Sequence, residues 1–182
     1  MLIYSPQLSL PSTASKAESF RDCSQVNSTL RRRDDLGRTC NGGKRVLSIA
    51  AREADIVGIN ATMSAGVIGP DAFNTMTAEA VDEKVSIVRE AAGARFNDIE
   101  MNVRAFLVSI TDDAKQAASG IASMLGVERQ MVEESPFALV GPTSKLIEDL
   151  LERRERWGFS YVIVGADDVD LFAPVVAALN GK

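Results

Sequence analysis

From residue 42 to the end of the chain, segments with the periodicity of amphipathic helices alternate with short apolar segments typical of buried strands. The helical patterns cover residues 44–54, 77–92, 111–125, 143–157 and 174–179, and the strand patterns cover residues 56–59, 99–110 and 159–164. Strands that are joined through helices run parallel in one sheet. This alternation therefore predicts an α/β fold with a parallel sheet.

The number of strands limits the choice of architecture. Three strands do not close a barrel, and a complete (β/α)8 barrel needs about 250 residues. The regular part of this chain has only about 140 residues. A partial barrel and a small open sheet both agree with the periodicity, which does not distinguish them.

Local signals predict where several elements begin. Residues 60–76 are a long connection for a purely structural loop, which favours a functional loop. Thr77 and Thr111 are suited to cap the helices that follow them, and Ser135-Pro136 is suited to start a short helix.

The last two helical patterns also make specific predictions. In helix 143–157 the leucines and isoleucine form an apolar stripe, and Arg153 is expected to face water with the other charged side chains. Pro174 suits the first turn of the final helix.

Residues 1–41 differ from the rest of the chain. They carry seven serines and both cysteines, and a net charge of +2 from Lys16 and five arginines against four acidic residues. They follow neither a helical nor a strand period, so we expect an irregular or disordered segment, followed by one folded unit at 42–182. Arg31-Arg32-Arg33 fits a solvated loop better than an anion-binding patch.

The composition excludes several classes of function. The chain has no histidine, which excludes Ser-His-Asp and Cys-His catalysis and HExxH zinc sites. The net charge of −5 argues against nucleic acid as the main partner, and no apolar run is long enough to span a membrane. Two cysteines and no signal-peptide pattern at the first residues predict a cytoplasmic protein.

A glycine pair before the first helix is the clearest candidate site. Gly42-Gly43 allows close approach of the backbone to an anion, and Lys44-Arg45 adds positive charge at the helix N-terminus. A phosphate site and a plain helix entry are both consistent with these residues. The segment is not a Walker A loop, because Arg38 and Arg45 replace its first glycine and its Ser/Thr.

Two further polar sites are ambiguous. Asp167-Asp168 follows the last strand and could bind a metal ion or act in acid–base chemistry, but helix capping and a turn explain it more simply. Arg104 would meet a ligand if it pointed into a barrel, and would otherwise lie along an exposed face.

Residues 42–182 resemble the C-terminal half of the luciferase-like monooxygenases, in particular the branch of F420-dependent oxidoreductases. Four stretches carry this resemblance in order and spacing, namely residues 42–58, 77–96, 135–141 and 153–164. They resemble the glycine loop with its helix and strand, the next helix, the segment before the penultimate helix, and the last barrel strand of the family.

The resemblance implies the C-terminal part of a (β/α)8 barrel and hydride transfer to or from a small-molecule substrate through F420, or alternatively FMN. In the family the glycine loop contacts the cofactor phosphate, which corresponds to Gly42 and Gly43 with the adjacent Lys44. The end of the following strand lies near the cofactor and corresponds to Gly58, Ile59 and Asn60. No catalytic acid or base and no metal ligand can be assigned.

The chain departs from the family before residue 42. Residues 36–41 are not the apolar strand from which the family enters its glycine loop, and residues 1–41 resemble none of its first four strands. We therefore expect a truncated barrel, and a half barrel would expose apolar faces unless it formed a homodimer. The alternative functions are a catalytically inactive fragment and a module that binds a phosphate ligand.

Overall fold

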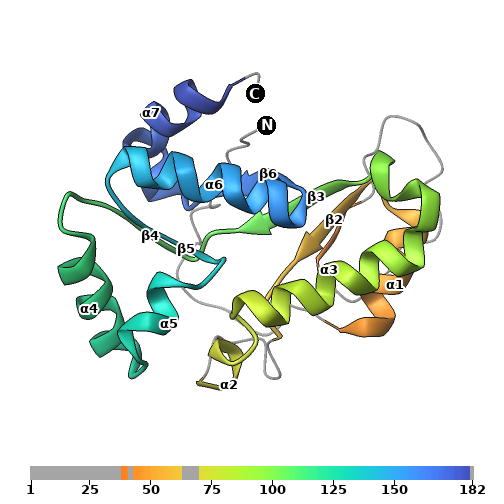
Figure 1. Ribbon diagram of the computed structural model, residues 1–182, viewed down its shortest axis with the longest axis horizontal. Helices are drawn as coiled ribbons and strands as arrows, with labels where there is room; N and C mark the ends of the chain where they lie inside the picture. The colour runs from red at the N-terminus through yellow and green to blue at the C-terminus, as the bar shows by residue number, and fades with distance from the viewer. Residues whose placement is uncertain (1–37, 41–42, 63–69, 181–182) are drawn as a thin grey trace, which may run out of the picture.

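The structure is a computed structural model that describes residues 38–40, 43–62 and 70–180 (Figure 1). Gly42, the triple arginine and most of the predicted N-terminal segment lie outside these residues, so the expected boundary at residues 41 and 42 stays a prediction. None of the described helices is both long and apolar enough to cross a membrane.

Four parallel strands form the main sheet, in the order β1 (Arg38–Cys40), β2 (Ile56–Ile59), β3 (Glu100–Arg104) and β6 (Phe159–Ile163). The spatial order follows the chain order without a reversal. Right-handed crossovers in a single direction place their helices on the same face of the sheet, whereas a doubly wound sheet reverses direction and is covered on both faces. The α/β class with parallel strands is confirmed, and the strand order does not reverse as it does in a doubly wound sheet.

The predicted strand 99–110 is divided into β3 and β4 (Leu107–Ile110), with a bend at Ala105-Phe106. Before the bend, the strand pairs with β2 and β6. After the bend, β4 pairs in parallel with β5 (Ala138–Gly141) in a second, two-stranded sheet. Because these strands lie in two separate sheets, the described part of the chain does not close into a barrel.

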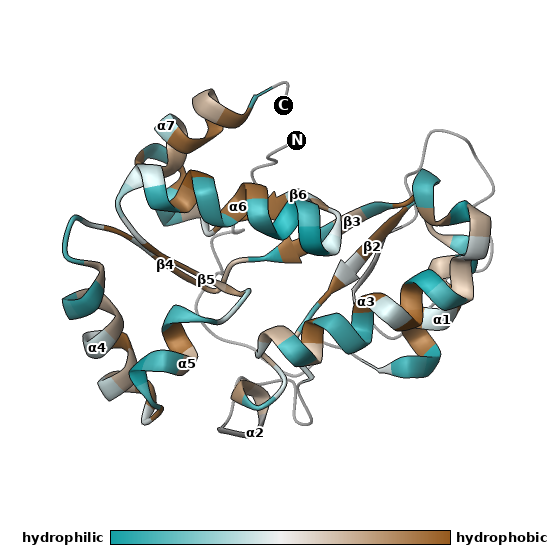
Figure 2. Ribbon diagram, in the orientation of Figure 1, coloured by the Kyte–Doolittle hydropathy of each residue, from teal (hydrophilic) through white to brown (hydrophobic). Residues whose placement is uncertain are grey.

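Three helices cover one face of the main sheet: α1 (Lys44–Glu53), α3 (Ala78–Ala92) and α6 (Thr143–Trp157). Figure 2 shows the alternation of hydrophobic and hydrophilic residues along these helices and the hydrophobic strands beside them. The helices bury the predicted apolar stripes against the strands, with Leu47 and Ala50 from α1, Val81, Val85 and Val88 from α3, and Leu146 and Leu150 from α6.

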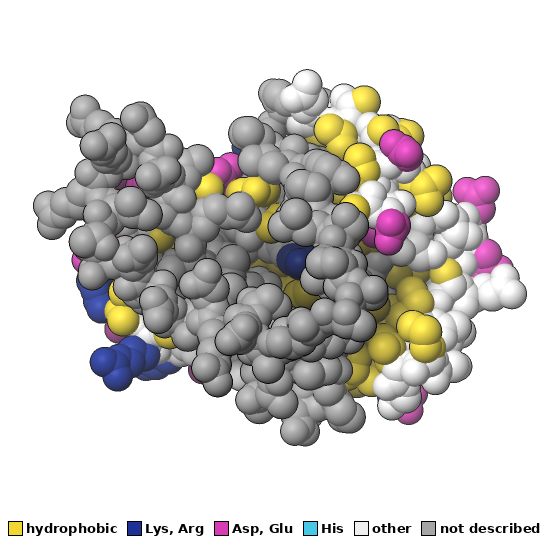
Figure 3. Space-filling view, turned by 180° about the vertical axis from the view of Figure 1, so that it is seen from behind, with side chains coloured by type: hydrophobic (Ala, Val, Ile, Leu, Met, Phe, Trp, Pro, Cys, Tyr) yellow, Lys and Arg dark blue, Asp and Glu magenta, His cyan; other side chains and the backbone are white. Residues whose placement is uncertain are grey.

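The view from behind shows hydrophobic side chains gathered on the side of the molecule that holds β4, β5 and α7 (Val169–Leu179) (Figure 3). All four residues of β4 are only half-buried. β4 is therefore less completely covered than its partner β5 and than β2, whose residues are all buried.

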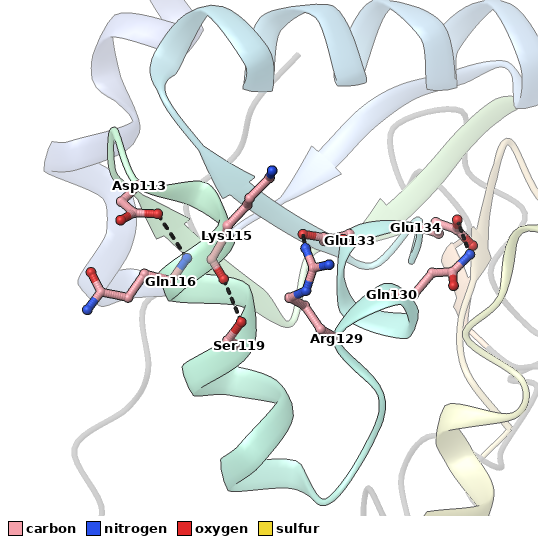
Figure 4. Close-up of polar contacts among 8 residues, drawn as sticks. All are labelled: Asp113, Lys115, Gln116, Ser119, Arg129, Gln130, Glu133 and Glu134. Atoms are coloured by element: carbon pink, nitrogen blue, oxygen red, sulfur yellow. Dashed lines mark hydrogen bonds and ion pairs between the residues drawn. The ribbon is translucent and has the colours of Figure 1, made fainter.

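The N-terminal caps confirm one prediction and correct another. Thr77 caps α3, because its Oγ1 accepts a hydrogen bond from the Ala80 N–H at 3.2 Å. The expectation that Thr111 caps α4 (Ala114–Leu125) is wrong: Asp113 is the N-cap, and its Oδ1 accepts from the Gln116 N–H at 2.9 Å (Figure 4). The helix starts later because Thr111 Oγ1 accepts from the Asp113 N–H, which forms a turn before the cap.

The segment between α4 and α6 also differs from the prediction. Ser135-Pro136 does not start a helix; α5 (Arg129–Glu133) precedes it and β5 follows it. The Ser135 hydroxyl donates to the carbonyl of Met76 at 2.9 Å, which fixes this turn against the start of α3. Ion pairing of Arg129 with Glu133 and a Gln130–Glu134 hydrogen bond support the short α5 (Figure 4).

Three further details correct the sequence-based expectations. Arg153 is buried in α6 instead of facing water, and Leu151 is exposed. Pro174 lies inside α7, because the 3₁₀ turn η3 (Ala166–Asp168) leads directly into a helix that begins at Val169. The connection 60–76 contains a short helix, α2 (Pro70–Phe73), and residues 63–69 within it lie outside the description.

Candidate functional site

The C-terminal ends of the parallel strands meet at one edge of the main sheet, where ligands of parallel α/β folds bind. β1 ends at Cys40 and pairs with Gly58 of β2, so the chain leading to Gly43 and the chain leading to Asn60 leave the sheet next to each other. β3 and β6 add Arg104 and Ile163 to the same edge, as direct register partners. The strand at residues 38–40 forms despite its polar composition, since it pairs through its backbone at the border of the sheet.

The N-terminus of α1 is the part of this edge that is best suited to an anion. Gly43 is the N-cap with φ −85° and ψ 138°, and no side chain caps the helix. Its carbonyl accepts from the Leu47 N–H at 3.0 Å, while the first-turn N–H groups have no partner within the helix. Gly43, Lys44 and Arg45 are all exposed.

The surroundings of Gly43 explain what a glycine contributes here. Its backbone angles are open to any residue, so its conformation does not require glycine. Among the described residues, a Cβ atom at this position would have no heavy atom within 4 Å, apart from its chain neighbours. The space beside Gly43 is therefore open, at the end of the helix where backbone N–H groups can bind a group such as a phosphate.

The three residues predicted at the end of β2 have different surroundings. Gly58 is a buried strand residue between Cys40 and Asn102. Ile59 is fully buried and its side chain belongs to the helix-covered core, so only its backbone is available to a ligand. Asn60 follows the strand, is half-buried, and uses its carbonyl to accept a hydrogen bond from Lys84 Nζ at 2.7 Å.

Lys84 is a residue of this region that the sequence analysis missed. It lies on α3 and is only 6% exposed, and its ammonium group also lies 3.5 Å from the Thr75 carbonyl. Burial lowers the pKa of Lys84, and the nearby Glu83 opposes this effect. Lys84 lies one turn from both Val81 and Val88, on the buried stripe of α3. This spacing was the signal in the sequence that Lys84 is buried.

The polar residues of β3 lie on the sheet face turned away from the helices. Met101 and Val103 belong to the helix-covered core, so the alternation along the strand places Asn102 and Arg104 on the other face. Asn102 is buried, and its Nδ2 donates to the Tyr161 carbonyl at 2.9 Å where the pairing with β6 is irregular. Arg104 is exposed and its guanidinium lies 5.6 Å from the ring centre of Phe106.

The acidic pair after β6 is placed at the start of α7. Asp168 is the N-cap residue, but its side chain makes no capping hydrogen bond. Burial raises the pKa of Asp168, with a further rise from Asp167 and an opposing hydrogen bond from the Gly165 backbone. The described residues contain no group of three or more His, Cys, Asp or Glu side chains arranged to hold a metal ion.

A separate groove of about 340 Å³ lies between α3, α5 and α6. Its lining includes five carboxylates, Glu79, Glu133, Glu134, Asp149 and Glu152, beside Arg153 and Arg156. Glu133 and Asp149 form ion pairs with Arg129 and Lys145, and Arg156 pairs with Asp82. Three carboxylates then remain in the lining against the single charge of Arg153, so the groove presents mainly negative charge. This charge disfavours a phosphate, in contrast to the N-terminus of α1.

No protein-family model matches the chain, and no curated protein matches it in sequence. Solved structures do match the fold. The crystal structure of the long-chain alkane monooxygenase LadA aligns with a TM-score of 0.50 at 12% identity, over 79% of this chain and 41% of that one.

Two further matches are the monooxygenase RslO1 from Streptomyces bottropensis and the coenzyme F420 dependent tetrahydromethanopterin reductase from Methanopyrus kandleri. RslO1 aligns at 18% identity and TM-score 0.48, over 78% of this chain and 47% of that one. The reductase aligns at 14% identity and TM-score 0.48, over 72% of this chain and 45% of that one.

The chain thus spans less than half the length of each of these structures. At these identities the likeness concerns the fold and not the activity. The predicted resemblance to the luciferase-like monooxygenases is confirmed at this level: the described residues form an α/β unit whose fold matches part of that of a luciferase-like monooxygenase.

Proposed function

We propose that residues 42–182 are the C-terminal half of a luciferase-like (β/α)8 barrel, and that the C-terminal edge of its sheet binds a flavin-type cofactor. The whole protein would then be an oxidoreductase that transfers hydride to or from a small organic substrate in the cytoplasm. The unreversed strand order and the single helix-covered face support the barrel segment.

The observation that carries the proposed cofactor site is the position of the uncapped α1 N-terminus. The helix has no side-chain cap, the space at Gly43 is open and Lys44 is exposed, shortly after a strand that pairs with β2. An anion there would meet the positive end of the helix dipole and a flexible ammonium group. Gly42, Gly43 and Lys44 would hold the cofactor phosphate.

The end of β2 would contact the rest of the cofactor. Gly58 and Ile59 would offer their backbone, and the half-buried Asn60 would offer its side chain at the edge. The resemblance favours F420, with FMN as the alternative. When bound, either cofactor supplies the capacity to accept or donate hydride, while the residues named here bind and orient it.

A phosphate-binding module is the second candidate function. The geometry at Gly43 and Lys44 suits any phosphate ligand, and nothing about the α1 N-terminus requires a redox cofactor. A half barrel that binds no cofactor at all, alone or as a homodimer, is the third. The three candidates differ in which ligands bind and in whether binding depends on the α1 N-terminus.

Titration with F420 and with FMN, followed by cofactor fluorescence, tests the proposal. The main variant is Gly43→Thr, because threonine and glycine are similarly tolerated at an N-cap while threonine fills the space in front of the N–H groups. We expect an unchanged unfolding midpoint and at least a tenfold weaker affinity. Lys44→Ala should weaken binding less, by about threefold to tenfold, since a surface charge contributes about 1 kcal/mol.

The exposed Arg52, at the other end of α1, provides the matched control. Arg52→Ala should leave the affinity unchanged. Binding of inorganic phosphate or a nucleotide, but of neither cofactor, would support the phosphate module instead. No binding of F420 or FMN at high micromolar concentration, by a cooperatively folded chain, would overturn the proposed function.

A further inference from the structure

We infer that Lys84 is a positioning residue: its buried ammonium group fixes the backbone at the C-terminal end of β2 in the arrangement that a ligand at this edge requires. The inference rests on the proposed function, because it assumes that Asn60 belongs to the ligand site. It assigns a role to a residue on the outer helix layer that lies outside the phosphate-binding segment.

The contacts of Lys84 join two segments that are distant in sequence. Its Nζ donates to the carbonyl of Asn60 at 2.7 Å and lies 3.5 Å from the carbonyl of Thr75. Thr75 Oγ1 in turn accepts from the Thr62 N–H at 2.8 Å and donates to the Ala72 carbonyl at 2.8 Å. The chain just after β2 and the turn just before α3 are therefore held together by one hydrogen-bonded cluster.

The burial of Lys84 shows that this cluster is built at a cost in free energy. An ammonium group that is removed from water is stabilised only if its donors find acceptors. Lys84 is 6% exposed, and the described residues contain no carboxylate in an ion pair with it. Its partners are backbone carbonyls, whose positions it consequently determines.

A side chain that served only the core would not need this charge. The neighbouring positions Val81, Val85 and Val88 on the same stripe of α3 are all apolar and almost fully buried. A fourth apolar residue would fit the stripe without any desolvated charge. The ammonium group is instead directed to the carbonyl of Asn60, immediately beyond the strand end where the proposed cofactor contacts lie.

Two variants on the same helix test this role. Lys84→Met keeps the length and apolar part of the side chain and removes all three donors. Val85→Ala removes core volume next to it without touching Asn60 or Thr75, so it provides a variant that is destabilised by packing alone. Both are compared with the wild-type chain at a temperature well below their unfolding transitions.

The first readout is affinity for FMN and F420 by fluorescence titration. We expect Lys84→Met to raise the Kd about tenfold, the effect of losing one charge-assisted hydrogen bond that positions the site. Val85→Ala should lower the unfolding midpoint and leave the Kd within about twofold of wild type. An unchanged Kd in Lys84→Met, or an equal increase in Val85→Ala, would overturn the inference.

The second readout is amide hydrogen exchange, which does not depend on a cofactor. We expect Lys84→Met to accelerate exchange at Thr62 and Met76, whose N–H groups bond to Thr75 Oγ1 and to the Phe73 carbonyl. Val85→Ala should not accelerate these two amides selectively. Exchange that is unchanged, or that rises equally throughout α3 and the sheet, would overturn the positioning role even if the cofactor binds.

The two readouts also separate failure of the inference from failure of the proposed function. If the wild-type chain binds neither cofactor, the proposed function fails and the exchange experiment alone decides the role of Lys84. Selectively faster amide exchange at Thr62 and Met76 in Lys84→Met would then support a positioning role at this edge for some other ligand. If the cofactor binds wild type and Lys84→Met equally, the proposed function stands and the inference fails.

Discussion

The region around Arg153 and the region around Lys84 each bury a cation of the outer helix layer, but they use it differently. Arg153 is 8% exposed, and its guanidinium donates to the carbonyls of Ser135, Pro136 and Ala138 at 3.4, 3.0 and 2.7 Å. Lys84 is 6% exposed and has one short contact, to the carbonyl of Asn60, and one long contact, to that of Thr75.

The difference between them lies in what the bound carbonyls belong to. Arg153 binds three carbonyls of one continuous turn, which leads from α5 into β5, so it maintains a local structure. Lys84 binds two segments that flank the C-terminal edge of the main sheet. The comparison suggests that the Arg153 region serves stability and the Lys84 region serves the geometry of a site.

The largest effect on stability is expected at Arg153. Arg153→Met would remove the guanidinium donor from three carbonyls, of which only that of Ser135 is shown to keep another donor, the Ala138 N–H. We expect a loss of about 3 kcal/mol in the free energy of unfolding. Urea denaturation measures this loss, with the exposed Glu155→Gln as a control that should stay within about 0.5 kcal/mol of wild type. A loss below about 1 kcal/mol would remove the distinction between the two regions. So would a cofactor Kd of Arg153→Met that rises as much as that of Lys84→Met.

A smaller effect is expected at the start of α4, on the Arg153 side of the molecule. Asp113→Ala removes the N-cap and should lower the free energy of unfolding by about 1 kcal/mol. Thr111→Ala should cost less, because its hydroxyl accepts a single hydrogen bond in the preceding turn. The same urea experiment compares the two, and a larger loss at Thr111 would restore the original sequence-based assignment of the cap.

The smallest effect is expected where α3 meets α6. Asp82 accepts hydrogen bonds from Arg156 Nε at 3.1 Å and from Trp157 Nε1 at 2.6 Å, but its side chain is 46% exposed, so its contribution is at most about 1 kcal/mol. The hydrogen bond from Arg156 is the main cause of a lowered pKa at Asp82, and burial partly opposes it.

The lowered pKa gives this prediction a pH dependence with a definite sign. A carboxylate whose pKa is lower in the folded state stabilises the fold above its unfolded pKa of about 4, and this stabilisation is lost as the pH falls through the folded pKa. The difference in unfolding free energy between wild type and Asp82→Asn should therefore shrink between pH 6 and pH 3. A constant or growing difference would show that Asp82 acts by packing and not by its charge.

Much of the fold can be predicted from the sequence, namely the segments in which the helix or strand period is strong. Helices begin at residues 44 and 143 and a strand covers 56–59, as predicted, and Thr77 is the predicted cap. The strand predicted at 159–164 is present and ends one residue earlier, at 163. The short strands β1 and β5 were missed, since three or four residues show no period and their pairing depends on neighbours distant in sequence. The separation of β3 from β4 likewise depends on which strand lies alongside each half.

Residues of the candidate site could be predicted only where the residue type and its position in the sequence both indicated a ligand site. Gly43 and Lys44 could be proposed as site residues because a glycine precedes the helix and a cation begins it. Lys84 and Arg153 were not recognised as buried, because a charged side chain on a helix is normally exposed and only the tertiary structure shows which carbonyls it reaches. That a charged residue interrupts an apolar stripe was the one signal available for Lys84.

The most direct test of the account compares the affinities of the chain for FMN and for riboflavin, which differ only in the phosphate. If the N-terminus of α1 holds that phosphate, FMN should bind at least tenfold more tightly than riboflavin, and Gly43→Thr should abolish most of this difference. Equal affinities, or a preference for FMN that Gly43→Thr leaves unchanged, would contradict a phosphate site at the glycine preceding α1.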